Sequence, residues 1–298
     1  MHCKRMSKGD VFDLPFGLRA NDVTRHILNI DSRFRTNPTS SSSSDFFYRL
    51  QNIVKNVLRI RITSIEFPNN YPIFTVKRRN VSLRFVIGAP ALKQLIVEIP
   101  EGNYSAYDMQ NQIITGLGTS GILCAFIESS GKFKFTASVP FDIDTTWDTI
   151  ERPFDYGLGY YLGFSRKIHS ATNVGGIYTL FSDQCANFAG DNYAFLKINE
   201  YDCVSQQTAD ESFTSLAKIL LREPKNYMAF DDYSSRHVKE VVFPQPQDLT
   251  RFHIQVLDAY GNVLDLCSSQ ISFSLEVLEI KNLSLYNSIR DSITLTYM

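Results

Sequence analysis

The side chains with the clearest capacity for chemistry are arginines and tyrosines rather than a catalytic set. A basic cluster lies in the first third of the chain, at Arg59, Arg61, Lys77, Arg78, Arg79 and Arg84. Such a cluster is either the solvated face of a sheet or a patch that meets an acidic partner. Together with two arginines that precede the cluster, the interface candidates among the basic residues are Arg33, Arg35, Arg59, Arg61, Arg78 and Arg79.

Tyrosine is abundant, with 15 residues in the chain. Tyrosine favours interfaces, where it supplies contact area and a hydrogen bond at low entropic cost. We therefore add Tyr160 and Tyr161 to the interface candidates. A second use of these rings, together with Tyr104 and Trp147, is stacking on sugars.

Patterns for catalysis, cofactors and metals are weak. The Gly-x-Gly-x-x-Gly pattern at 116–121 follows an expected helix and precedes an expected strand, the reverse of a dinucleotide site. Asp142, Asp144 and Asp148 lack the glycine and terminal glutamate of a calcium loop. We predict no catalytic residue, no cofactor and no metal. Carboxylates that only the fold brings together are the one enzymatic alternative.

The bulk properties indicate a globular chain. Its 298 residues suggest about two domains, or one domain with a large insertion. A net charge of -1 argues against a general nucleic-acid coat. Five dispersed cysteines without a C-x-x-C pair favour free thiols. With no leader peptide and no apolar run long enough to span a bilayer, we expect a soluble protein made in the cytosol.

The stretch from Asn56 to Phe74 organises the predicted fold. Leu58, Ile60 and Ile62 alternate with polar residues, which is typical of a strand with one buried face. The strand ends at the turn cluster after Pro68. Its apolar face needs a second layer, so we expect a sandwich built from residues 46–79 and 168–280.

Between these parts we expect an inserted α+β subdomain at residues 80–167. Strands at 82–87 and 94–99 precede a helix that Ser105 can cap and that Gly116 and Gly118 can end. Strands at 122–127 and 132–136 follow, which gives the order β-β-α-β-β. Residues 73–77 are expected to form a further short strand.

The two ends of the chain differ in composition from the predicted sandwich. Residues 1–45 are a basic arm with a serine run at 40–44, expected either to be disordered or to order on a neighbouring subunit or an acidic surface. Residues 281–298 form a polar tail, with an added strand expected at 292–297.

Four segments resemble a family of virion structural proteins from nucleocytoplasmic large DNA viruses. They are Ile30-Asp31-Ser32-Arg33-Phe34-Arg35, the strand from Asn56 to Pro68, Ile99-Pro100-Glu101-Gly102-Asn103-Tyr104-Ser105, and Tyr161-Leu162-Gly163-Phe164. The closing strands at 252–280 fit the same family. Many relatives have aspartate where this chain has Phe34, so the arm's contacts are expected to differ.

The resemblance implies a mainly β, jelly-roll-like antiparallel β-sandwich and a non-enzymatic role as a minor capsid protein. Its implied partners are the major capsid protein, other minor capsid proteins and further copies of itself. Its implied location is the capsid shell, after synthesis in the host cytoplasm. Nothing in the sequence indicates specific nucleic acid or an internal membrane as a partner. The alternative is a receptor- or glycan-binding module associated with a spike or penton.

Overall fold

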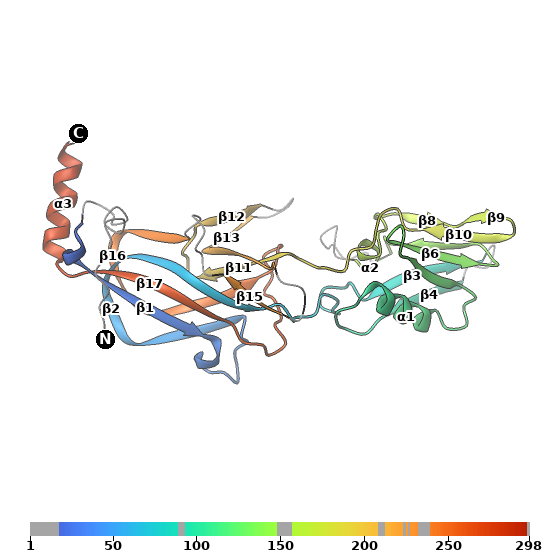
Figure 1. Ribbon diagram of the computed structural model, residues 1–298, viewed down its shortest axis with the longest axis horizontal. Coiled ribbons are helices and arrows are strands. Elements are labelled where there is room, and N and C mark those ends of the chain that lie inside the picture. The colour runs from blue at the N-terminus through green and yellow to red at the C-terminus, as the bar shows by residue number, and fades with distance from the viewer. Residues whose placement is uncertain are drawn as a thin grey trace. The chain divides into compact units, whose positions relative to one another are not determined.

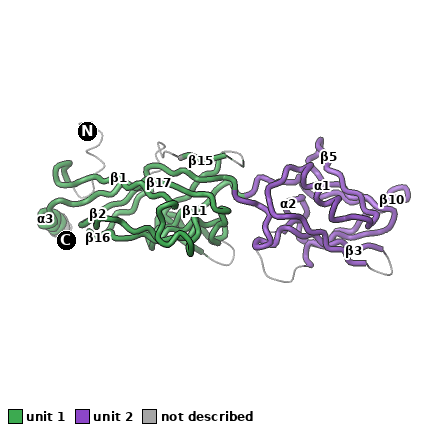
Figure 2. The backbone as a smooth tube through the Cα atoms, turned by 90° about the horizontal axis from the view of Figure 1, so that it is seen from below, with its two compact units in different colours: residues 1–70, 191–298 green, residues 71–190 purple. Residues whose placement is uncertain are grey.

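The computed structural model describes residues 18–88, 93–147, 157–207, 212–222, 225, 227–231 and 239–296. The chain divides into two compact units, which Figure 2 colours separately. Unit 1 comprises residues 1–70 and 191–298, and unit 2 comprises residues 71–190. Unit 2 is therefore an insertion within unit 1. No helix of the described residues has the length and apolar character needed to cross a membrane.

The described part of unit 1 is dominated by one seven-stranded antiparallel sheet in the order β1-β17-β2-β16-β11-β14, with β15 also paired to β2 (Figure 1). A separate hairpin pairs β12 with β13. The elements are η3 (Ala20–Asp22), β1 (Val23–Asp31), η4 (Ser32–Phe34), β2 (Asp45–Pro68), β11 (Tyr193–Ile198), β12 (Val204–Gln207), β13 (Ser212–Ser215), β14 (Ala217–Leu220), β15 (Met228–Asp231), β16 (Glu240–Leu257), β17 (Ser272–Ile280) and α3 (Leu283–Thr296).

The longest strand of the sheet pairs with a different partner on each of its edges. β2 runs for 24 residues and pairs with β16 from Asp45 to Arg61 and with β17 from Val57 to Glu66. The buried residues Ile60, Ile62 and Phe273 lie in these strands. The predicted mainly β, jelly-roll-like sandwich is confirmed, and so is the burial of Leu58, Ile60 and Ile62.

The described part of the expected arm belongs to this sheet. β1 pairs with β17 along its whole length, so residues 23–31 are a strand of unit 1. Part of the serine run is also packed, because Ser43 and Ser44 are buried and the Val256 N–H donates to the Ser44 carbonyl (2.8 Å). Residues 1–17 of the expected arm lie outside the described residues. The tail is a helix through Thr296 rather than a strand from 292.

The described part of unit 2 forms two four-stranded antiparallel sheets, in the orders β4-β3-β7-β8 and β5-β6-β10-β9. Its elements are β3 (Ser82–Ile87), β4 (Lys93–Glu98), α1 (Ala106–Leu117), β5 (Leu123–Ile127), β6 (Lys132–Ala137), β7 (Phe141–Asp144), α2 (Leu158–Tyr161), β8 (Ile168–Ser170), β9 (Thr172–Val174) and β10 (Ile177–Phe181).

One apolar core joins the two sheets of unit 2. Phe85 of β3 and Phe135 of β6 meet with ring centroids 5.6 Å apart. Helix α1 adds its buried residues Met109, Ile113 and Leu117 to the same core. The predicted order β-β-α-β-β over β3 to β6 is confirmed. The unit continues beyond 167, because β8 pairs with β7 and β10 pairs with β6.

The helix of unit 2 begins and ends where the sequence predicts. The Ser105 hydroxyl accepts the Asp108 N–H (3.1 Å), and the Asp108 carboxylate faces back toward Ser105. This reciprocal cap satisfies backbone donors that the first helical turn leaves unpaired. Gly118, at a φ of 50°, ends the helix. The glycine pattern at 116–121 is thus a helix terminus followed by a strand, as expected.

The expected strand at 73–77 is wrong, because asparagine side chains take its backbone groups. Asn103 accepts the Ile73 N–H (2.8 Å) and donates to the Tyr71 carbonyl (3.1 Å). Asn80 accepts the Thr75 N–H (2.8 Å) and donates to the Ile73 carbonyl (2.8 Å). Local side-chain bonds of this kind compete with a sheet ladder. The segment is a turn at 76–79 with one isolated bridge, between Phe74 and Gly102.

Two glycines allow a matched test of the unit 2 fold. Gly163 has a φ of 89°, and a Cβ there would overlap the Gln184 carbonyl. Gly175 also has a positive φ, 62°, but a Cβ there meets no atom within 4 Å. We expect Gly163→Ala to lower the free energy of unfolding by about 3 kcal/mol or more and Gly175→Ala by about 1 kcal/mol.

Urea unfolding followed by tryptophan fluorescence measures this difference, because the chain's single tryptophan, Trp147, lies in unit 2. Equal losses for the two variants would contradict the backbone contact at Gly163.

Candidate functional site

The site begins with the tight turn that ends β1. Asp31 is the N-cap of η4, and its carboxylate accepts the Arg33 backbone N–H (2.8 Å). Aspartate favours such turns because its short side chain bonds to the backbone two residues on. The turn therefore follows directly from the local sequence Asp31-Ser32-Arg33.

Arg33 covers the Asp31 carboxylate with a bidentate contact. Its Nε lies 3.0 Å from Oδ1 and 2.8 Å from Oδ2 of Asp31. The Asp31 side chain is buried, whereas the Arg33 side chain is 67% exposed. The side-chain hydrogen bonds from Arg33 hold the pKa of the Asp31 carboxyl below its usual value. The turn thus presents a guanidinium in a fixed position to a partner.

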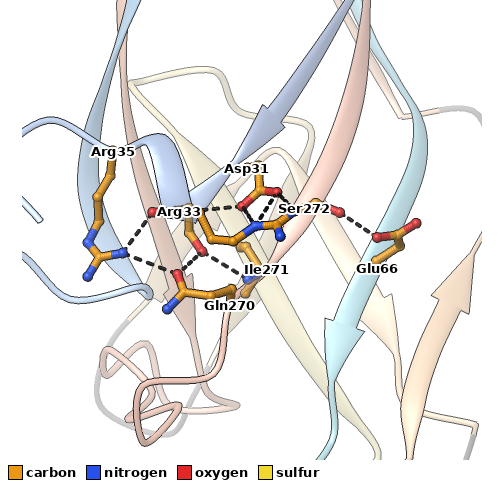
Figure 3. A network of polar contacts seen from close by, with 8 residues as sticks. Asp31, Arg33, Arg35, Glu66, Gln270, Ile271 and Ser272 are labelled. Atoms are coloured by element: carbon orange, nitrogen blue, oxygen red, sulfur yellow. Dashed lines mark hydrogen bonds and ion pairs between the residues drawn. The ribbon is translucent and has the colours of Figure 1, made fainter.

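Arg35 and Ser32 hold the turn against the start of β17 (Figure 3). Arg35 donates to the Ser32 carbonyl (2.7 Å), to Gln270 Oε1 (3.1 Å) and to the Ser41 carbonyl (3.2 Å). The Ser32 hydroxyl donates to Gln270 Oε1 (2.7 Å) and accepts the Ile271 N–H (3.0 Å). Arg35 is therefore occupied within its own chain, and only Arg33 of this pair is available to a partner.

One row of side chains crosses four strands beside the turn. The pairing registers place Asp31 opposite Ser272, Ser272 opposite Glu66, and Glu66 opposite Phe230. Directly opposite residues of antiparallel strands share a face of the sheet. The Ser272 hydroxyl donates to the Glu66 carboxylate (2.6 Å), as Figure 3 shows. The row carries two carboxylates and an exposed aromatic ring on one face.

Exposed apolar side chains accompany this row. Phe34 and Phe230 are each 71% exposed, and Met228 is also exposed. A hollow of about 460 Å³ lies among Arg33, Glu66, Met228 and residues 268–272. Exposed aromatics beside fixed charge are typical of protein-binding surfaces. We name this region the turn surface, defined by Asp31, Arg33, Phe34, Glu66, Met228 and Phe230.

Arg59 and Arg61 do not belong to an outer patch. Arg59 is buried and lies 3.1 Å from Glu276 Oε1 and 3.5 Å from Glu240 Oε2. Arg61 lies 3.1 Å from the other Glu276 oxygen. Because Arg59 is already buried in the single chain, it does not present the exposed guanidinium that an interface candidate needs. Glutamates on the neighbouring strands β16 and β17 supply the counter-charges that allow its burial.

The remaining arginine candidates lie in unit 2. Arg78 and Arg79 are half-buried in the turn at 76–79, where the Arg78 N–H donates to the Thr75 hydroxyl (3.1 Å). The six predicted arginines therefore divide between the two units, four in unit 1 and two in unit 2.

The two tyrosine candidates differ from each other. Tyr161 is buried against Phe74, with ring centroids 4.9 Å apart, whereas Tyr160 is 43% exposed. Tyr160 and Trp147 line a hollow of about 20 Å³. That volume holds about one water molecule rather than a sugar ring.

The expected lack of a metal site stays a prediction, because Asp148 lies outside the described residues. Asp144 pairs with Arg84 (3.5 Å) and accepts the Thr146 N–H (2.8 Å). Within the described ranges, no group of three metal-ligating side chains gathers in one place.

Met228 and Phe230 are not among the candidate residues that the sequence suggested. They belong to β15, which pairs with the end of β2. The short apolar run Tyr-Met-Ala-Phe at 227–230 was a signal for a short strand. The signal is brief, and polar residues flank it on both sides.

Comparisons with known proteins add little to this geometry. No protein-family profile and no curated protein matches the chain. Among solved structures, the chain is similar to the mavirus penton protein, with 9% identity over 85% of this chain and 99% of that one, and a TM-score of 0.46. At this identity and score, the likeness assigns neither a family nor a role.

The Asp31–Arg33 pair predicts a pH-dependent contribution to stability. A carboxyl whose pKa is lowered by folding stabilises the protein above its ordinary pKa, near 4, and loses that effect as pH falls through the folded value. We expect Asp31→Asn to cost about 1–3 kcal/mol at pH 7 and progressively less below pH 4.

Urea titrations at several pH values measure this change. Glu66→Gln is the control, because its amide oxygen still accepts the Ser272 hydroxyl, so we expect a change within about 0.5 kcal/mol. A pH-independent loss in Asp31→Asn would argue against the ion pair as the cause.

We expect the buried cluster of Arg59, Arg61 and Glu276 to contribute more to the stability of the fold than the Asp31–Arg33 pair does. Glu276→Gln keeps the side-chain volume but removes the carboxylate that faces Arg59 and Arg61, so we expect a loss of about 3 kcal/mol. Glu279→Gln, on the same strand, breaks a more exposed pair with His26 (2.6 Å) and is expected to cost at most about 1 kcal/mol. Thermal unfolding followed by circular dichroism compares them, and equal stability of the two variants would refute the cluster's structural role.

Proposed function

We propose that the chain is a non-enzymatic structural protein of a virion, within the capsid of a large icosahedral DNA virus. The proposal rests on the position in the fold of one segment that carries the family resemblance. Residues Ile30 to Arg35, which carry part of the resemblance, build the fixed turn at the edge of the unit 1 sheet. The same turn supplies Asp31, Arg33 and Phe34 to the turn surface.

The role we propose within the shell is that of a minor capsid protein which bridges neighbours. The turn surface supports protein contact, since it combines exposed aromatic rings with a guanidinium held by Asp31. Each of the two units has strands and buried residues of its own, so one chain offers two compact units for binding. The proposed partners are the major capsid protein and other minor capsid proteins.

The proposed alternative is a receptor- or glycan-binding module at a spike or penton. Its support is the aromatic pair Trp147 and Tyr160 beside Arg166 in unit 2. The small volume of that hollow weighs against a sugar ligand. A glycan array with the purified chain separates the two proposals, because only the alternative predicts binding above background.

Cryo-electron microscopy of purified particles tests the capsid proposal directly. We expect density for both units in the shell, with the turn surface covered by another chain. Absence of the chain from the shell would overturn the proposal, and a position only at the fivefold vertices would favour the alternative.

The turn surface also makes a prediction for assembly. We expect Phe34→Ser combined with Phe230→Ser to reduce incorporation into particles by roughly tenfold, because truncating central aromatic anchors removes much of an interface's binding energy. Ile53→Ser, at a side chain that is 55% exposed on β2, is the matched control. Unchanged melting of the purified variants, with quantitative mass spectrometry of the particles, separates lost contact from lost folding. Normal incorporation of the double variant would count against this surface.

A further inference from the structure

Strand β1 leaves a long open edge on the unit 1 sheet. It runs for nine residues and ends the strand order beside β17. In the described part of the chain, other strands at sheet edges are shorter: β14 has four residues, β4 has six and β9 has three. Proteins commonly keep edge strands short to avoid unintended pairing. The length of β1 therefore sets it apart.

The register fixes which backbone groups face outward. The Ser32 N–H donates to the Ile271 carbonyl (2.9 Å), and the Lys281 N–H donates to the Asp22 carbonyl (3.0 Å). Hydrogen bonding alternates along an antiparallel strand, so even-numbered residues bond to β17. The outward groups belong to Val23, Arg25, Ile27, Asn29 and Asp31, and the described residues supply no backbone partner for them.

This edge lacks three of the usual features that block pairing, which are proline, lysine and a β-bulge. Its middle residue, Ile27, has an apolar side chain that is 60% exposed. An exposed apolar residue at the centre of a regular edge favours addition of a further strand.

We propose that β1 pairs antiparallel with β1 of a second copy of this chain, about a twofold axis at Ile27. Ile27 is the midpoint of the strand, so this register uses all five outward-facing residues of each copy. It places Ile27 against Ile27 of the second copy, and Arg25 against Asn29 of the second copy. The two sheets then continue across the axis as one.

The charges of β1 favour a second copy of this chain as the partner, and they favour antiparallel over parallel pairing. Arg25 and Asp31 lie toward opposite ends of β1. Antiparallel pairing brings Arg25 beside Asn29 and one step from Asp31 of the second copy, whereas in-register parallel pairing would set Arg25 against Arg25.

This inference does not depend on the capsid proposal, because it concerns the purified chain alone. Disulfide trapping tests it. Directly opposed, hydrogen-bonded residues have Cα atoms about 5.5 Å apart, which is within the range that a disulfide spans. We expect Ile27→Cys to form a covalent dimer under mild oxidation at least about tenfold faster than Ile53→Cys, whose side chain is similarly exposed. Mass spectrometry of the linked peptides identifies the bond.

A charge variant supplies a second measurement. Ile27→Lys sets two like charges opposite each other at the axis, and we expect the dimer dissociation constant to rise roughly tenfold by sedimentation velocity. Ile53→Lys is the control and should leave it unchanged, and unchanged circular dichroism shows that both variants fold.

Two outcomes would overturn the proposal. A wild-type chain that stays monomeric at all concentrations tested would exclude the dimer. A bond from the Ile27→Cys variant to Cys3 of the same chain would show that the N-terminal segment occupies the edge instead.

Discussion

The pairing of β2 with strands from the far end of the chain is the constraint on which unit 1 depends. β2 contacts β16 along one half and β17 along the other, and β17 in turn carries β1. The turn surface exists only because these pairings bring Asp31, Ser272 and Glu66 into one row. A shift of one residue in either pairing would turn these side chains to the opposite face. The register of the sheet therefore determines the geometry of the turn surface.

Arginine has two distinct roles in this sheet. Arg59 lies inside, where Glu276 and Glu240 balance its charge, and it contributes to the fixed pairing of β2 with its neighbours. Arg33 lies outside, where Asp31 orients it but leaves most of its surface to solvent. The same residue type thus helps to fix the pairing of strands at Arg59, and presents a charge at the surface at Arg33. The difference comes from the surroundings of each arginine: strands β16 and β17 beside Arg59, and the turn held by Asp31 at Arg33.

Sequence patterns predicted the features that depend on residues close together in the chain. Alternation gave the burial of Ile60 and Ile62, and the Ser105 cap with Gly118 gave helix α1. Sequence reasoning failed where the burial or conformation of a residue depends on residues far away in the chain. The counter-charge of Arg59 lies 217 positions away in Glu276, and Asn103 converts residues near Ile73 from a strand to a turn. Strand β8 belongs to unit 2 through its pairing with β7, and strands β9 and β10 belong to it through their pairing with each other and with β6. No local pattern reveals these pairings.

The insertion of unit 2 also sets an order of events during synthesis. β1 and β2 are made first, but β16 and β17 follow only after all of residues 71–190. At about 5–20 residues per second, β2 waits roughly ten to forty seconds for these partners. Unit 2, whose strands pair among themselves, can fold during that interval. Throughout it, the apolar face of β2 has no permanent cover, so protection of the nascent chain matters most for these residues.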